Sequence, residues 1–194
     1  MGRIHFDPRR LARHVIAEDL AVRRAFSRGA LTRIEAEIAA QELRHAGELR
    51  FAVEGGLSPV SVLRGVTAQQ RARELFSALR VWDTEENNGV LVYLLLADRA
   101  VEIVADRAIH AVAGDDQWSV ICASMRGHFS AGRYEEGVVS GLRAIGDRLA
   151  EHFPASGSPV NELPDGPVVL WSGIRPPMAD CPLPTAGRAG SSCP

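Results

Sequence analysis

The stretch that most constrains the fold is Val90–Ala97, a run of eight uncharged, mostly aliphatic residues between two acidic clusters. A helix needs about 20 apolar residues to cross a bilayer, so this run is too short to span a membrane. Apolar residues at every position instead predict a central β-strand that helices cover on both faces.

The segments around this run predict the rest of the sheet. Glu48–Glu54 alternates between apolar and polar residues and predicts a strand, and Thr67–Gln70 has the pattern of a capping box that opens a helix. A strand, a helix and a second strand form a right-handed parallel crossover. A turn at Asp98-Arg99 then returns Val101–Ala105 antiparallel. We therefore expect an α/β fold with a small mixed sheet, built from a parallel crossover plus a hairpin and covered by helices.

Other helices are expected around this sheet. Their apolar residues recur every three to four positions, which predicts one face packed on the core. They are an amphipathic helix over 8–26, a helix that a capping box at Thr32–Glu35 opens and that runs to about Arg44, a helix capped by Asp115 or Asp116 that carries Trp118 to Phe129, and a last helix that carries Val138 to Phe153.

Charge and proline divide the chain into three parts. Residues 1–28 hold seven Arg against three acids, whereas residues 29–153 hold thirteen Arg against eighteen acids, a net charge of −5. Residues 154–194 hold nine of the eleven prolines, and we expect a mostly flexible tail in which Pro167–Trp171 docks as a short edge strand. The α/β domain is thus assigned to 29–153.

The acidic body argues against nucleic-acid binding, which usually requires a basic face. The basic N-terminal helix either packs on the domain or contacts a protein partner or an anionic surface. The N-terminus lacks the apolar run of a secretion signal, so we expect a soluble, cytoplasmic protein. The chain has no Lys, which excludes Schiff-base chemistry, and no protein nucleophile can be identified.

The expected turn brings acids together at one rim of the sheet. With a two-residue turn at Asp98-Arg99, Ala97 pairs with Ala100, and Leu91 lies opposite Asp106. Asp106 and Arg107 then lie at the end where the central strand begins. Up to six carboxylates converge there, from Asp83, Glu85, Glu86, Asp106, Asp115 and Asp116, together with Asn88.

Such a rim has two explanations. Like charges this close raise one another's pKa, and a hard cation relieves the repulsion. Carboxylate and amide oxygens are the ligands of Ca²⁺ and Mg²⁺. The alternative is that these acids only keep loops soluble and cap helices. The opposite rim, with Glu54, Asp98 and Arg99, is a second candidate because ligands often bind beyond the carboxyl ends of parallel strands.

The middle of the chain resembles the TPM domain family, whose members include a thylakoid-lumen acid phosphatase and many bacterial proteins. The resemblance lies in "NNGVLVYLLLADRAVEIVADR", "DDQW" and "HFSAGRYEEGVVSGLRAIGDRLAEHFP", and it covers about Leu31 to Pro154. "NELPD" at Asn161–Asp165 is similar to a tail of soluble bacterial members. The chain departs from the family pattern where "ADRAI" replaces a Gly-aromatic-Gly stretch.

The resemblance implies an open three-layer α/β/α sandwich and a divalent cation, Ca²⁺ first and Mg²⁺ as the alternative. The metal ligands expected at the acidic rim are Glu86, Asn88, Asp106, Asp115 and Asp116. One functional hypothesis is a non-enzymatic interaction module associated with stress or repair. The other is a weak metal-assisted acid phosphatase on phosphate monoesters, with Asp106, Asp116 and Arg107 as its catalytic residues.

Overall fold

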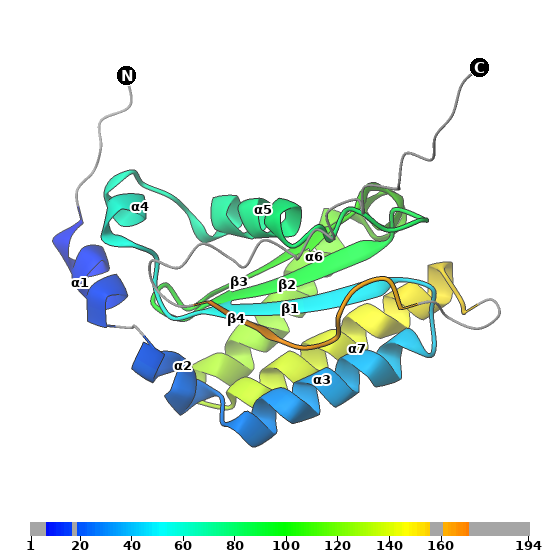
Figure 1. Ribbon diagram of the computed structural model, residues 1–194, viewed down its shortest axis with the longest axis horizontal. Helices are drawn as coiled ribbons and strands as arrows, with labels where there is room; N and C mark the ends of the chain where they lie inside the picture. The colour runs from blue at the N-terminus through cyan, green and yellow to red at the C-terminus, as the bar shows by residue number, and fades with distance from the viewer. Residues whose placement is uncertain (1–6, 17–18, 156–160, 171–194) are drawn as a thin grey trace, which may run out of the picture.

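A four-stranded mixed sheet forms the centre of the molecule (Figure 1). The structure is a computed structural model that describes residues 7–16, 19–155 and 161–170. The strands lie in the order β3-β2-β1-β4, and β1 runs parallel to both of its neighbours whereas β3 runs antiparallel to β2. Their bounds are β1 Glu48–Glu54, β2 Gly89–Leu95, β3 Ala100–Ala105 and β4 Val168–Leu170. The expected crossover, hairpin and edge strand are confirmed.

Helices cover both faces of this sheet, which confirms the three-layer α/β arrangement. Figure 1 shows α4 and α5 over one face, and α3, α6 and α7 over the other. Alternate residues of β2 enter the two cores: Val92 packs with α3, α6 and α7, and Leu91 packs with α5. The helices are α1 Pro8–Ile16, α2 Asp19–Ala25, α3 Arg28–Glu42, α4 Pro59–Leu63, α5 Ala68–Ala78, α6 Arg107–Ser130 and α7 Tyr134–His152.

The helix starts agree only in part with the sequence patterns. Thr67 and Gln70 form the expected capping box at the start of α5. The second pattern was wrong: α3 begins at Arg28, after the N-cap Ser27, and the Thr32 hydroxyl donates to a backbone carbonyl inside the helix. Ser27 offers the first side-chain acceptor that the chain reaches, so the helix starts there. The single helix expected over 8–26 is two helices, α1 and α2.

The hairpin register also differs from the expected one. Leu95 pairs with Ala100 and Leu91 with Val104, so the turn has four residues instead of two. Arg99 takes a left-handed conformation, with φ of 51°, and this allows the longer turn. The shift amounts to two residues, so every side chain keeps its face of the sheet. The residue opposite Asp106 is Gly89 rather than Leu91.

The largest correction concerns α6. This helix begins at Arg107, and its N-cap is Asp106, whose carboxylate accepts the Arg107 N–H. Asp115 and Asp116 lie inside the helix, so neither of them is its N-cap residue. Three aspartates could each have capped a helix here, and the helix extends back to the one that directly follows β3.

Part of the C-terminal region lies against the domain. β4 pairs in parallel with the end of β1, and Leu163 and Leu170 are buried in the core that lies between α5 and the sheet. The other expected tail residues, 156–160 and 171–194, lie outside the described residues. Within the described part of the chain, no helix is long and apolar enough to cross a bilayer.

Candidate functional site: an acidic cavity at the amino end of the sheet

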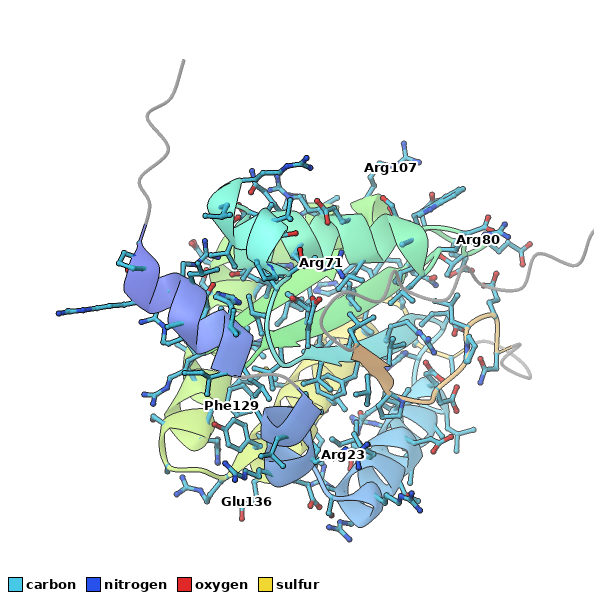
Figure 2. The ribbon with its side chains drawn as sticks, turned by 60° about the vertical axis from the view of Figure 1, so that its left-hand side comes forward. Arg23, Arg71, Arg80, Arg107, Phe129 and Glu136 are labelled. Carbon is cyan, nitrogen blue, oxygen red and sulfur yellow. The ribbon has the colours of Figure 1, made fainter. Side chains whose placement is uncertain are left out.

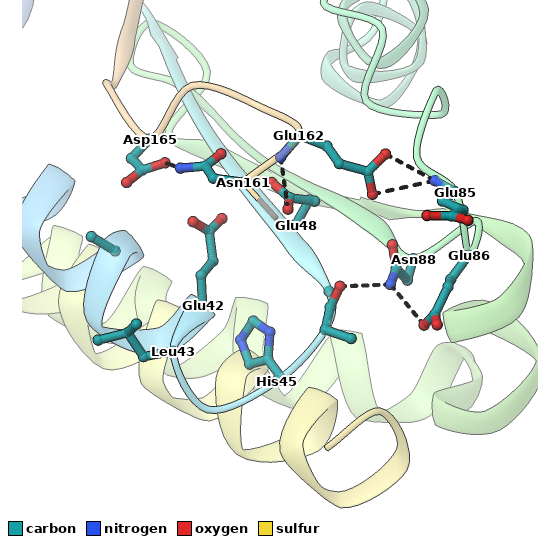
Figure 3. A pocket seen from close by; sticks show the side chains of 13 residues that line it. Glu42, Leu43, His45, Glu48, Glu85, Glu86, Asn88, Asn161, Glu162 and Asp165 are labelled. Carbon is teal, nitrogen blue, oxygen red and sulfur yellow. Dashed lines mark hydrogen bonds between the residues drawn. The ribbon is translucent and has the colours of Figure 1, made fainter. Parts of the chain in front are cut away.

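A cavity of about 350 Å³ opens at the amino-end rim, the edge of the sheet where β1 and β2 begin and β3 ends. Three segments that are distant in the sequence form it: the end of α3 with the turn into β1, the entry to β2, and the C-terminal segment before β4 (Figure 3). We call it the acidic cavity. Its polar lining consists of Glu42, His45, Glu48, Glu85, Glu86, Asn88, Asn161, Glu162 and Asp165.

The segment that enters β2 forms one wall of the acidic cavity, and its backbone geometry fixes the position of that wall. Asn87 adopts a left-handed conformation, with φ of 54°, which Asn tolerates better than most residues. A Cβ at Gly89 would lie 1.9 Å from the carbonyl oxygen of Val81, so only glycine fits there. Packing therefore requires glycine at position 89, and the buried side chain of Asn88 lies next to Glu86.

Hydrogen bonds hold the C-terminal segment to the cavity. The Glu48 carboxylate accepts the backbone N–H groups of Glu162 and Leu163, each at 3.1 Å. The Glu162 carboxylate in turn accepts the N–H of Glu85 at 3.0 Å. Carboxylates on β1 and on the tail thus join three separate segments, and Figure 3 shows these side chains around one opening.

The cavity concentrates negative charge without compensating partners in its lining. Of its six carboxyl groups, none forms an ion pair with another described residue. Arg50, buried on the adjacent part of β1, offsets the charge only by its electrostatic interaction with Asp165, Glu42 and Glu48. Burial raises the pKa of Glu42 to about 8 and also raises the pKa of Glu48. Near neutral pH, Glu42 therefore keeps its proton.

Two other buried polar side chains line the cavity with unused hydrogen-bonding atoms. Both ring nitrogens of His45 and the amide oxygen of Asn88 find no hydrogen-bond partner among the described residues. Burial lowers the pKa of His45 to about 4, so its ring is neutral near pH 7. The Asn88 amide nitrogen donates to the Ala46 carbonyl at 2.7 Å, which fixes the orientation of the amide. An oxygen left over in an acidic cavity is suited to a cation.

The predicted metal ligands that the structure describes do not lie at one place. Glu86 and Asn88 line the acidic cavity, whereas Asp106 lines a different one beside β3. Asp116 is exposed on α6, ten residues after Asp106 and hence about 15 Å further along the helix axis. Nothing is described of the Asp115 side chain. Among the described residues, no three His, Cys, Asp or Glu side chains already converge on one metal position.

The predicted catalytic residues are likewise apart. Asp106 caps α6, Asp116 lies more than two turns away, and the Arg107 side chain is 89% exposed. Figure 2 shows Arg107 projecting from the molecule. Its guanidinium donates to the Asn87 side chain at 3.3 Å and does not reach into the acidic cavity.

Sequence reasoning missed most of the cavity wall. Glu42, His45, Glu48 and Glu162 were not predicted as site residues. One signal was available: Glu48 is the first residue of a strand parallel to β2, and its register partner is Gly89, next to Asn88.

At the second candidate rim, at the carboxyl end of β1 and β2, both acids are paired with basic side chains of the protein itself. We call this rim the carboxyl-end rim. Arg10 contacts Asp98 at 2.9 Å, and His14 contacts it at 3.0 Å. Because His14 Nδ1 accepts the Leu57 N–H, its proton lies on Nε2 and is donated to Asp98.

Glu54, the other acid of this rim, is also paired. It binds Arg71 at 2.9 Å and accepts the Tyr93 hydroxyl at 2.7 Å. Figure 2 shows Arg71 between α5 and the sheet. With both carboxylates engaged, this rim has no free acid to offer a ligand within the described part of the chain.

A small mixed sheet between two helical layers, with an acidic cavity at its amino end, defines the class as an open α/β sandwich domain. The TPM domain model matches residues 22–148, more than half of the chain. The chain therefore belongs to the TPM domain family.

Two solved structures are similar to this chain. The BA42 protein from the psychrophilic bacterium Bizionia argentinensis is 26% identical, with a TM-score of 0.66, and the match covers 74% of this chain and 94% of that one. The N-terminal domain of a P. gingivalis protein is 22% identical, with a TM-score of 0.55, covering 68% of this chain and 83% of that one, and it supports the fold alone. Among curated protein sequences, none matches this chain.

Proposed function

We propose that this chain is a TPM-domain module that binds a divalent cation, Ca²⁺ first and Mg²⁺ as the alternative, in the acidic cavity. The observation that carries the proposal is the set of six carboxyl groups without ion-pair partners among the described residues, beside the unused amide oxygen of Asn88. Carboxylate and amide oxygens are the ligands that these hard cations prefer, and Ca²⁺ accepts flexible geometry.

The residues that would hold the ion are Glu86 and Asn88 from the predicted set, with Glu48 and Glu162 in place of the three aspartates of α6 and its cap. Glu86 and Glu162 are exposed, so their side chains are able to move toward an ion. Such an ion would neutralise the cavity and tie the C-terminal segment to the sheet. This is the behaviour of an interaction module that presents its tail in one conformation, rather than that of a catalyst.

A titration of the ¹⁵N-labelled protein with CaCl₂, starting from EDTA-treated protein and followed by amide shifts, tests the proposal. We expect the shifts to cluster around Gly47, Asn88 and Glu162. The double variant Glu86→Gln/Glu162→Gln should weaken binding by about tenfold or more, because each lost ligand charge is worth about 1 kcal/mol or more.

The matched control is Glu151→Gln, which removes one exposed carboxylate from α7 outside the cavity and should leave binding unchanged. Shifts centred on Asp106 to Asp116 instead would move the ion to the originally predicted residues. The absence of any saturable shift with Ca²⁺ or Mg²⁺ would end the cation proposal.

The N-terminal segment remains a proposed contact with a protein partner or an anionic surface. Arg10 and His14 are engaged by Asp98, whereas Arg9 and Arg13 are exposed, and the Arg13 guanidinium lies 3.8 Å from Asp98. Substituting Arg9 and Arg13 by Gln should reduce partner recovery in a pull-down and leave the Asp98 contacts of Arg10 and His14 in place.

The alternative function is a weak metal-assisted phosphatase, and one observation favours it. The second carboxylate oxygen of Asp106 is buried without a hydrogen-bond partner among the described residues, next to the exposed guanidinium of Arg107. Turnover of p-nitrophenyl phosphate should then be lost with EDTA and in Asp106→Asn, which retains the helix cap. Turnover that survives Asp106→Asn plus Asp116→Asn would exclude these residues as catalytic groups.

A further inference from the structure

β3 is an edge strand, and half of its main-chain groups face away from the sheet. It pairs only with β2 among the described strands. The Asp106 N–H donates to the Gly89 carbonyl at 2.9 Å, which makes these two residues a hydrogen-bonded pair. Bonded and non-bonded pairs alternate in an antiparallel ladder. Val101, Ile103 and Ala105 therefore direct their N–H and C=O groups outward.

A groove of about 590 Å³ follows this outward edge. Four consecutive residues of β3, 102–105, line it. Successive residues of a strand point to opposite faces, so a groove lined by all four runs along the edge rather than over one face. Phe76 of α5 forms one wall and Trp118 of α6 the other, with Trp82, 49% exposed, beside them. We call this the edge groove.

The shape of the edge groove selects its occupant. Because helices from opposite faces of the sheet wall it on both sides, a single extended chain can enter, whereas the sheet of a second copy would meet α5 and α6 first. The outward N–H of Ile103 interacts with the sulfur of Cys122, a weak acceptor. An added strand is the natural partner for such an edge, and apolar walls accept its alternate side chains.

The polar groups of the groove indicate the chemistry of that chain. Arg73 is exposed and makes no hydrogen bond or ion pair with another described residue, and the Arg107 side chain is 89% exposed. Glu102 and Asp106 are more buried, which leaves the two guanidinium groups at the surface. Trp118 Nε1, a donor, and one Asp106 oxygen, an acceptor, also lack partners among the described residues, and they lie about 18 Å apart along α6, so they would meet different parts of a bound segment.

We propose that the edge groove binds an extended segment of a partner protein, which adds to β3 as a strand. The segment carries aromatic or aliphatic residues at alternate positions, against Phe76 and Trp82, and acidic residues facing Arg73 and Arg107. This site is separate from the acidic cavity and does not depend on the cation.

The test is a selection of phage-displayed random peptides on the full chain in EDTA, followed by affinity measurements on synthetic copies. Binding should fall by about tenfold in Ala105→Pro, which removes one outward N–H and places a ring at the edge. The strand should tolerate this change because the Ala105 N–H is not part of the ladder with β2. Ala105→Val, which keeps the N–H, should bind as the wild-type chain does.

Three further measurements keep the test independent of the folding of Ala105→Pro. Arg73→Glu should weaken binding of the acidic peptides, whereas Arg64→Glu, an exposed change that follows α4 and lies outside the groove, should not. A peptide with N-methylated backbone at alternate positions should lose binding although its side chains are unchanged. Hydrogen exchange should slow at Val101, Ile103 and Ala105 in the complex.

Equal binding of the N-methylated peptide would overturn strand addition, and so would protection that maps away from β3. Failure to enrich any peptide on the wild-type chain over the Ala105→Pro chain would overturn the proposal as well. Each of these outcomes leaves the cation proposal unaffected, because the selection is carried out without divalent metal.

Discussion

Both ends of the sheet bury carboxylates, but among the described residues only those of the carboxyl-end rim form ion pairs with guanidinium groups. There, Asp98 forms an ion pair with Arg10, and Glu54 forms one with Arg71. At the amino-end rim, the partners of Glu48 among the described residues are two backbone N–H groups of the C-terminal segment. The same residue type therefore forms a structural ion pair at one end and remains without an ion-pair partner among the described residues at the other.

Proton affinity follows this difference. Although burial alone raises the pKa of Asp98, the hydrogen bonds from His14 and Arg10 hold it well below its usual range. Glu42 accepts the Leu49 N–H but has no arginine or histidine partner among the described residues, and burial raises its pKa to about 8. A paired carboxylate keeps its charge and supports the fold. A buried carboxyl group without such a partner is costly to ionise, and a bound cation would lower that cost. Shifted pKa values of this kind are common at ligand-binding sites.

The largest expected effect comes from breaking a pair at the carboxyl-end rim. Glu54→Gln leaves the Arg71 guanidinium, whose side chain is only 18% exposed, without its main charge partner. Removing one member of a buried pair typically costs about 3–5 kcal/mol of unfolding free energy. Urea denaturation at pH 7 would measure this loss.

Glu74→Gln is the matched control, because Glu74 contacts the same Arg71 but its side chain is 57% exposed. A surface pair of this kind contributes about 1 kcal/mol or less. Equal losses in the two variants would mean that burial does not distinguish the ion pairs of this rim.

The next effect concerns Glu42 and depends on pH. Burial raises the folded-state pKa of Glu42 to about 8, above the unfolded value, so its protonated form stabilises the fold at low pH. This contribution is lost as pH rises through about 8, because the unfolded chain releases the proton earlier. His45, whose folded pKa is lowered to about 4, contributes the opposite slope only below about pH 6.5.

Between pH 6.5 and 8, the contribution of Glu42 to stability is therefore separated from that of His45. Glu42→Gln should gain roughly 1–2 kcal/mol relative to the wild-type chain across this window, measured by urea denaturation in EDTA. Glu37→Gln, on the same helix, is the control: Arg143 lowers the pKa of Glu37, so its titration lies well below this range. A gain that does not change with pH would show that Glu42 is ionised throughout.

Much of the fold was predictable because its signals are local. The apolar run of β2 and the alternation of β1 each determine a strand without reference to distant residues, and both strands were placed correctly. The start of α6 was not predictable, because Asp106, Asp115 and Asp116 all satisfy the local rule for an N-cap. The hairpin register depended on Arg99 adopting a left-handed conformation, which its residue type does not signal.

The site was predictable only where it is contiguous in sequence. Glu86 and Asn88 were found because they directly precede a strand that is easily recognised. Glu42, Glu48 and Glu162 were missed because three separate segments bring them together. The position of Glu48 depends on the register of β1 against β2, and the position of Glu162 depends on two hydrogen bonds that the C-terminal segment donates to Glu48. Tertiary contacts of this kind have no periodicity in the sequence.

The smallest expected effect separates the two rims by a ligand instead of a mutation. If Ca²⁺ binds the folded chain at the acidic cavity, it raises the free energy of unfolding by about 1.4 kcal/mol at ten times its dissociation constant. Glu86→Gln/Glu162→Gln should abolish this increment, whereas Glu74→Gln, at the carboxyl-end rim, should retain it in full.

Because binding favours ionised carboxylates, the increment at a fixed Ca²⁺ concentration should grow between pH 6.5 and 8, as the Glu42 proton is released. Thermal denaturation with and without EDTA at both pH values measures it. An increment that survives the cavity variant but disappears in Glu74→Gln would place the ion at the wrong rim and reverse the comparison.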